Sequence, residues 1–184
     1  MLCNTLEDAA RERASIETVI AHMVSGVLIA SASPKPSHLR PFERAGIPVI
    51  TVDRDVVGFA GDAVAVDNRL IGRLAAEHLL EQGRFTPLVL NHTIDISPMR
   101  DREDGFCRAM AAAGHPVDPD RVFSLPFHAD RPAEVARIVA TTQADAVFAT
   151  TNTLTGEAFS ALRSQGRAIG PEIGLVGSTT TGGI

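Results

Sequence analysis

Short apolar segments alternate with longer amphipathic segments along almost the whole chain, and this alternation limits the possible folds. The predicted strands are residues 27–30, 49–52, 63–66, 87–90, 122–125, 146–149 and 174–176, with the end of a further strand at residues 2–4. The predicted helices are residues 8–23, 42–45, 71–79, 100–113, 133–140 and 154–165. Strands buried on both faces read as continuous apolar runs, and parallel strands need long, usually helical, connections. We therefore predict an α/β fold of parallel sheets flanked by helices.

The ends of these elements carry recognisable signals. Thr5 and Asp8 stand in the spacing of a capping box, in which Thr5 accepts a backbone hydrogen bond at the start of the first helix. Gly83 ends the helix that includes Leu79. A domain boundary near Gly83 would give two lobes, residues 1–83 and 84–184.

Polar or aromatic residues follow the predicted strands at their carboxyl ends. These residues are Asn4, Ser31, Asp53, Asp67, Asn91, Phe127, Thr151 and Ser178. In open parallel sheets, ligands bind outside the carboxyl ends of the strands. The sequence therefore predicts a ligand site along these edges.

Charge and composition exclude several classes of function for this part of the chain. The formal net charge is −5, and the 17 Lys and Arg residues form no basic stripe. A surface that binds nucleic acid needs such a stripe. If the protein acts on DNA, we expect the DNA-binding part to lie outside this chain.

The sequence also lacks the patterns of catalytic, cofactor and metal sites. It contains no glycine-rich dinucleotide or phosphate loop, no G-x-S-x-G and no H-E-x-x-H. The six histidines share no metal-ligand spacing, and we expect His78 to be packed in a helix face. Cys3 and Cys107 fit no metal set, and the chain has neither a secretion signal nor a long apolar span. We predict a cytoplasmic protein that is not an enzyme and that has no cofactor, no metal and no membrane partner.

Seven motifs occur in order along nearly the whole chain. They read CNT (3–5), VSGVLI (24–29), GIPVITVDR (46–54), VAVDN (64–68) with AEHL (76–79), SPMRDREDGF (97–106), AVFATTN (146–152) and IGLVG (173–177). Together they resemble the effector-binding core of the LacI/GalR family of transcription regulators. The resemblance implies a two-lobe fold of the type I periplasmic-binding-protein class, with a cleft for a small molecule between the lobes.

The resemblance also implies what the chain does not include. A member of this family has a helix-turn-helix, a hinge helix and a first strand and helix before the first motif. It has further strands and helices after the last motif. We therefore expect both lobes to be incomplete, so that exposed sheet edges would make the isolated chain fold poorly. DNA would be bound only through the helix-turn-helix, and a homodimer is expected.

The motifs assign ligand-binding roles to particular residues. Asp67 would accept hydroxyl hydrogens, Arg102 would donate two hydrogen bonds, and the ring of Phe127 would stack on the ligand. Thr151 stands where the family often has Asn, and Ser97 lies in a loop that lines the cleft. The implied ligand is a sugar or a related small molecule.

Several of these residues have a structural alternative. Asp67 could cap the helix that begins at Asn68, Arg102 could pair with an acidic neighbour, and Phe127 could belong to the core. Asp53 and Arg54 are expected to brace a loop.

Two positions depart from the pattern of the family. Thr151 replaces Asn, and Thr179 stands where the family commonly has Asp. An uncharged hydroxyl is a weaker partner than a carboxylate. Either the ligand is not a typical hexose, or the segment after Gly177 is not the native continuation.

Two other functions stay open at this point. A periplasmic receptor of an ABC transporter shares the fold, although the short V-D-R and R-x-x-G-F motifs favour the regulator. A small α/β enzyme is the more remote alternative, because the chain lacks a catalytic set.

Overall fold

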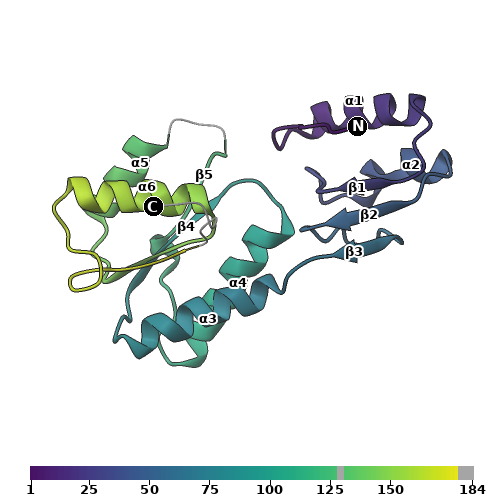
Figure 1. The fold of residues 1–184 in the computed structure, drawn as a ribbon. Helices are drawn as coiled ribbons and strands as arrows, with labels where there is room; N and C mark the ends of the chain where they lie inside the picture. The colour runs from purple at the N-terminus through teal and green to yellow at the C-terminus, as the bar shows by residue number, and fades with distance from the viewer. Residues whose placement is uncertain (128–130, 178–184) are drawn as a thin grey trace. The chain divides into compact units, whose positions relative to one another are not determined.

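The computed structural model describes residues 1–127 and 131–177. The chain forms two compact units (Figure 1). The first comprises Met1–Val66 with Asp95–Pro98, and the second comprises Asp67–Ile94 with the described residues from Met99 to Gly177. Each unit contains one parallel sheet with helices packed on it.

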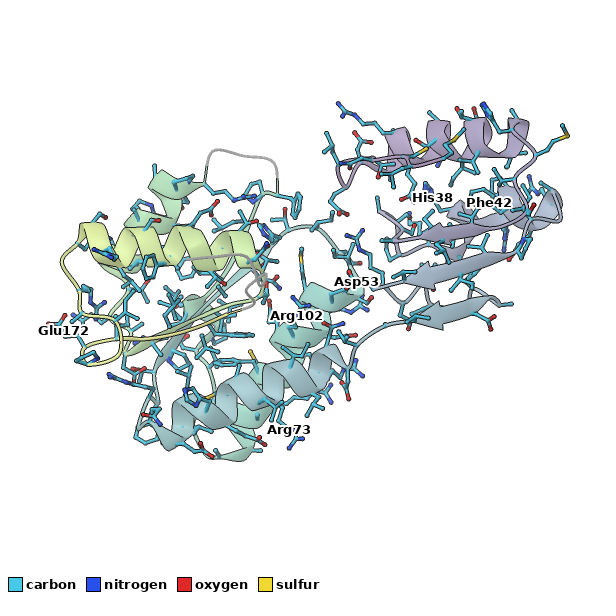
Figure 2. The ribbon with its side chains drawn as sticks, viewed as in Figure 1. His38, Phe42, Asp53, Arg73, Arg102 and Glu172 are labelled. Atoms are coloured by element: carbon cyan, nitrogen blue, oxygen red, sulfur yellow. The ribbon has the colours of Figure 1, made fainter. Side chains whose placement is uncertain are left out.

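The first unit is built on a sheet of three parallel strands in the order β1-β2-β3. The strands are β1 (Val27–Ile29), β2 (Val49–Val52) and β3 (Asp62–Val64). The helices are α1 (Ala9–Ala21), the short 3-10 helix η1 (Pro36–His38) and α2 (Arg40–Arg44). Ile16, Leu39, Phe42, Val49 and Val56 form its buried apolar core, and Figure 2 shows Phe42 between α1 and the sheet.

The start of α1 differs from the prediction. Asp8 is the N-cap, and its carboxylate accepts from the backbone N–H groups of Ala10 and Arg11 at 2.7 and 3.0 Å. The predicted cap, Thr5, contributes only its backbone oxygen, which accepts from the N–H of Asp8. Asp8 therefore takes the capping role because its carboxylate reaches the first free N–H groups of the helix. Residues 2–4, predicted as the end of a strand, form no strand.

A buried ionic network holds the loops at the carboxyl edge of the first sheet. The guanidinium of Arg54 donates to both carboxylate oxygens of Glu7 at 2.5 and 2.6 Å and to the backbone oxygen of Ser31 at 2.8 Å. The carboxylate of Glu12 accepts from the Ser31 hydroxyl at 2.7 Å and lies 2.9 Å from Nε2 of His38. Arg54 therefore braces loops, as its sequence position predicts.

The second unit is a three-layer sandwich around a parallel sheet in the order β5-β4-β6-β7. The strands are β4 (Pro87–His92), β5 (Val122–Leu125), β6 (Ala146–Ala149) and β7 (Gly174–Gly177). The helices are α3 (Asn68–Glu81), α4 (Ser97–Ala112), α5 (Pro132–Thr141) and α6 (Asn152–Ser164), with the 3-10 helix η2 (Pro119–Arg121) before β5. Helices α5 and α6 cover one face of the sheet, and α3 and α4 cover the other (Figure 1).

Alternate residues of the central strands enter the two cores. Leu88 and Val147 pack with α5 and α6, whereas Val89 and Phe148 pack with α3 and α4. The ring of Phe106 on α4 stacks on Phe148 with centroids 4.2 Å apart. This arrangement explains why the strands read as unbroken apolar runs, since both faces of the sheet are buried.

Two glycines allow α3 and α4 to cross with their backbones in contact. A Cβ atom on Gly72 would lie 2.0 Å from the backbone oxygen of Arg102, and one on Gly105 would lie 2.1 Å from that of Arg69. Neither position tolerates a side chain without separating the helices. The crossing packs α3 against α4, and both helices cover the second sheet. The lobe boundary near Gly83 stays a prediction.

The exposed face of α3 also differs from the prediction. His78, which the sequence predicts to be packed in a helix face, is exposed, and Ile71 and Leu74 are 37% and 52% exposed. The buried side of α3 is instead formed by Gly72, Ala75, Ala76 and Leu79. Gly72 faces the backbone of α4, whereas Ala75, Ala76 and Leu79 pack in the core between the helices and the sheet.

Among residues 1–127 and 131–177, no helix combines the length and apolar character needed to cross a membrane.

Replacement of Gly72 by alanine tests the crossing. We expect Gly72→Ala to lower the free energy of unfolding by about 1–3 kcal/mol, because the added methyl group would overlap the α4 backbone. Gly156→Ala is the matched control, since Gly156 lies exposed on α6 with open space around it. The control should gain about 0.5–1 kcal/mol from helix propensity. Urea unfolding measures the free energy of unfolding of both variants. Equal changes in the two variants would contradict the close crossing of α3 and α4.

Candidate functional site

The carboxyl edge of the second sheet gathers polar and aromatic residues from three strands. His92 is the last residue of β4, Phe127 lies two residues after β5, and Thr151 lies two residues after β6. The strands are parallel, with His92 paired to Leu125. Their carboxyl ends therefore meet at one edge, which is where open parallel sheets bind ligands.

Thr151 is both the cap of α6 and a partner of His92. Its hydroxyl oxygen accepts from the backbone N–H of Leu154 at 3.3 Å and lies 3.1 Å from Nε2 of His92. Its extended backbone (φ −134°, ψ 158°) is the conformation that an N-cap residue needs. The local sequence therefore fixes the position of this hydroxyl at the end of β6.

The ring of Phe127 lies against His92 in an edge-on arrangement, with the ring centroids 4.9 Å apart. The guanidinium of Arg131 lies 6.0 Å from the centre of the Phe127 ring. Arg131 donates to the backbone oxygens of Pro126 and Phe127 and pairs with Glu157 at 3.0 Å. Arg131 thereby fixes the turn that carries Phe127.

The neighbourhood of His92 disfavours its charged form. Burial, and next the positive charge of Arg131, lower the pKa of His92 below its ordinary value of 6.5, while the hydrogen bond to the backbone oxygen of Leu125 and the charge of Glu157 oppose the shift in part. The buried arginine at this edge, Arg131, is paired with the partly buried carboxylate of Glu157. The edge therefore presents a neutral imidazole, a hydroxyl and an aromatic ring.

Arg102 joins the start of α3 to the end of β6 (Figure 2). Its Nε donates to the side-chain oxygen of Asn68 at 2.9 Å, and its Nη1 donates to the backbone oxygen of Thr150 at 2.8 Å. The D-N and R-x-x-G-F motifs are thus in direct contact, because Gly72 and Gly105 bring the two helices together.

Asp67 is exposed and caps α3. Its carboxylate accepts from the backbone N–H of Leu70 at 2.9 Å. This is the structural alternative that the sequence allowed. A role in accepting ligand hydroxyls stays a prediction.

Ser97 belongs to the first unit and is buried. Its hydroxyl oxygen accepts from the backbone N–H of Asp55 at 2.8 Å, so it holds the loop after β2. Its predicted ligand contact also stays a prediction. Thr179 lies outside the described residues.

The structure thus brings Phe127 and Thr151 to one edge, with His92 between them, and places Arg102 against the backbone next to Thr151. Sequence reasoning missed two partners, His92 and Asn68. His92 lies two residues beyond the predicted end of its strand, so the apolar run alone gave no signal for it. Asn68 was visible in the D-N motif, but its contact with Arg102 depends on the helix crossing.

In the described ranges, no group of three or more His, Cys, Asp or Glu residues is placed to hold a metal ion.

A parallel α/β sheet with polar side chains at its carboxyl edge defines a class of small-molecule-binding fold. Residues 1–178 match the family of periplasmic binding proteins and the sugar binding domain of the LacI family, and the chain belongs to this family. The fold is accordingly of the periplasmic-binding-protein type, with parallel sheets flanked by helices.

Curated relatives are named repressors. The ribose operon repressor of Halalkalibacterium halodurans is 28% identical over 179 residues, which cover 96% of this chain and 52% of that protein. The transcriptional repressor PurR of Actinobacillus pleuropneumoniae is 24% identical over 178 residues, or 96% of this chain and 53% of that protein. The chain therefore spans about half the length of these relatives.

A solved structure with a bound sugar has the same fold. It is a periplasmic binding protein/LacI transcriptional regulator from Alkaliphilus metalliredigens in complex with D-xylulofuranose. It is 23% identical, with a TM-score of 0.80, and the match covers 96% of this chain and 65% of that chain.

The contacts of Arg102 predict a structural cost for its removal. Arg102→Ala should lower the free energy of unfolding by about 1.5–3 kcal/mol, because it leaves the oxygens of Asn68 and Thr150 without a charged donor. Arg73→Ala is the control, since Arg73 makes an exposed pair with Glu77 on the outer side of α3 (Figure 2). The control should change stability by less than about 1 kcal/mol. If urea unfolding showed a similarly small loss of stability in both variants, Arg102 would not stabilise the protein through its contacts with Asn68 and Thr150.

The pKa of His92 predicts a loss of stability in acid. Because its folded pKa is lowered below 6.5, the unfolded chain binds the proton more tightly. Its contribution to stability should be complete above pH 6.5 and decline as the pH falls through 6.5 toward the folded pKa. In His92→Gln, the free energy of unfolding should therefore depend less on pH below pH 6.5. Replacement of the exposed His78 by glutamine should leave this pH dependence unchanged. An unchanged slope in His92→Gln would contradict the prediction.

Proposed function

We propose that this chain is the effector-binding core of a LacI-type transcription regulator and that it binds a sugar or a related small molecule reversibly. The family match and the repressor names of the curated relatives support this proposal. They favour a regulator over a periplasmic receptor, and they give no support to an enzyme.

The observation that carries the proposal is the group of side chains at the carboxyl edge of the second sheet. An aromatic ring and a hydroxyl, those of Phe127 and Thr151, both contact His92. A sugar offers apolar C–H faces and hydroxyl groups, and binding sites for such ligands combine an apolar platform with a few fixed polar groups. Phe127 is the platform in this proposal, and Thr151 is one of the fixed polar groups.

The charges around this edge fit an uncharged ligand. Arg131 is buried and is already paired with Glu157, and Arg102 donates to Asn68 and to a backbone oxygen. A charged ligand would have to compete with these partners. The edge therefore suits a neutral polyhydroxylated molecule, which agrees with the sugar in the Alkaliphilus structure.

In the whole protein, the bound effector would change the affinity of a DNA-binding part for its operator. Such coupling requires only that the effector bind two conformations with different affinities. The proposed protein acts as a homodimer in the cytoplasm and changes no covalent bond. Its DNA contacts lie in a helix-turn-helix outside the 184 residues.

Calorimetric titration of the protein with D-ribose, D-xylulose, common hexoses and nucleosides tests the proposal. At least one of these compounds should bind and be recovered unchanged. Phe127→Ala should weaken that binding about tenfold, because it removes an aromatic contact worth on the order of 1–2 kcal/mol.

Phe85→Ala is the matched control. Phe85 is a partly exposed phenylalanine that lies before β4, at the opposite edge of the same sheet, where it stacks on His115. This variant should bind the ligand as the unaltered protein does. Binding of no compound, or equal losses in both variants, would count against the proposed site.

A further inference from the structure

A continuous hydrogen-bonded chain crosses the carboxyl edge of the second sheet. It runs from the backbone oxygen of Leu125 to Nδ1 of His92 at 3.3 Å, and from Nε2 of His92 to the hydroxyl of Thr151 at 3.1 Å. It ends where the backbone N–H of Leu154 donates to the same hydroxyl at 3.3 Å. His92 and Thr151 are both at least nine-tenths buried, so water has little access to these bonds.

The acceptor at one end of this chain fixes the tautomer of His92. A backbone oxygen can only accept, so Nδ1 must carry the hydrogen that contacts Leu125. Burial, with the positive charge of Arg131, lowers the pKa of His92, so the ring is neutral at pH 7 in spite of the nearby carboxylate of Glu157. In a neutral imidazole with a hydrogen on Nδ1, Nε2 has none and can only accept.

The tautomer in turn fixes the hydrogen of Thr151. Nε2 of His92 can only accept, so the Thr151 hydroxyl must donate its single hydrogen to it. One of the two lone pairs of the hydroxyl oxygen already accepts from Leu154. In the described part of the chain this leaves the hydroxyl one lone pair and no hydrogen for a ligand.

We propose that His92 is a positioning residue that makes the Thr151 hydroxyl a hydrogen-bond acceptor toward the ligand. The site would then select, at this point, a ligand group with a hydrogen to donate, such as a hydroxyl or an amine. It would discriminate against a carbonyl, ether, carboxylate or phosphate oxygen in the same place. This inference rests on the proposed function, in which the carboxyl edge of the second sheet binds the ligand.

The surroundings of His92 support a fixed arrangement. The ring of Phe127 packs edge-on against the imidazole, which hinders its rotation. The oxygen of Leu125 also accepts from the backbone N–H of Thr93 at 2.9 Å, so it keeps one partner even when His92 is replaced. A phenylalanine at position 92 would therefore keep the aromatic packing and remove only the acceptor for the Thr151 hydrogen.

The position of the hydrogen can be measured without a ligand. Two-bond ¹H–¹⁵N correlation spectra of the protein at pH 7 distinguish the two neutral tautomers and the charged form of a histidine. We expect the His92 signals of the tautomer with hydrogen on Nδ1, both in the unaltered protein and in Thr151→Ser. Signals of the other tautomer, or of the charged ring, would overturn the inference whatever the protein binds.

Ligand analogues then test the consequence for specificity. D-Ribose is titrated beside its monodeoxy and monodeoxyfluoro derivatives, since fluorine can accept weakly but cannot donate. The variant Thr151→Val identifies the sugar hydroxyl that contacts Thr151. Removal of that hydroxyl should not weaken binding to Thr151→Val any further. At this position both derivatives should bind the unaltered protein about fivefold to tenfold more weakly than ribose, and by similar factors.

The variant His92→Phe frees the Thr151 hydrogen and should change this preference. In it, the deoxyfluoro sugar should bind more tightly than the deoxy sugar at the same position, whereas in Thr151→Ser the two should stay equal. A deoxyfluoro sugar that binds the unaltered protein as well as ribose does, or the absence of any position coupled to Thr151, would overturn the proposal. If D-ribose does not bind, the sugar or nucleoside found by calorimetry takes its place.

The two proposals can fail separately. If no compound binds, the proposed function fails, and the NMR spectra still decide the direction of the hydrogen bond between His92 and Thr151. If a compound binds and the spectra show hydrogen on Nε2, the proposed function stands and the role of His92 is wrong.

Discussion

The contact between the backbones of α3 and α4 at Gly72 and Gly105 determines much of the second unit. It allows the Arg102 side chain to reach Asn68 at the start of α3 and the backbone oxygen of Thr150 at the end of β6. A helix pair held apart by two methyl groups would break these contacts. The adjacent residue, Thr151, caps α6 and carries the hydroxyl of the candidate site. A packing constraint between two helices thus also positions a polar group at the edge of the sheet.

The buried charges in each unit are used to fix loops. Arg54 pairs with Glu7 in the first unit, and Arg131 pairs with Glu157 in the second. Removal of one partner would leave an uncompensated buried charge, which is more costly than the loss of the pair. Arg131 also holds the turn that carries Phe127. The pair therefore supports the candidate site, and in the proposed function it stays intact when a ligand binds.

Much of the fold could be predicted from the sequence because its strands are buried on both faces. The runs at residues 122–125 and 146–149 became strands with the predicted bounds. The less accurate predictions concern features that depend on tertiary contacts. The orientation of α3 depends on the glycine crossing, which periodicity does not reveal. The cap of α1 depends on whether the side chain of Thr5 or that of Asp8 reaches the free N–H groups.

The candidate site was predictable in part for a similar reason. The carboxyl ends of parallel strands meet at one edge, so the positions of Phe127 and Thr151 could be placed there from sequence. The helix cap made by Asp67 was one of the two roles that the sequence allowed for this residue. The contact of Ser97 with the backbone of Asp55 could not be foreseen, because it joins two segments that are far apart in the sequence. His92 connects the two predicted residues, and its role appears only when the ends of β4, β5 and β6 are seen together.

The central claim is that the carboxyl edge of the second sheet binds a small polyhydroxylated molecule without changing it. The most direct measurement is a crystal structure of the protein grown with the sugar or nucleoside that calorimetry identifies. The account predicts an intact ligand with one face against the Phe127 ring and a hydroxyl within hydrogen-bond distance of the Thr151 oxygen. A ligand bound elsewhere, in contact with neither residue, would contradict it.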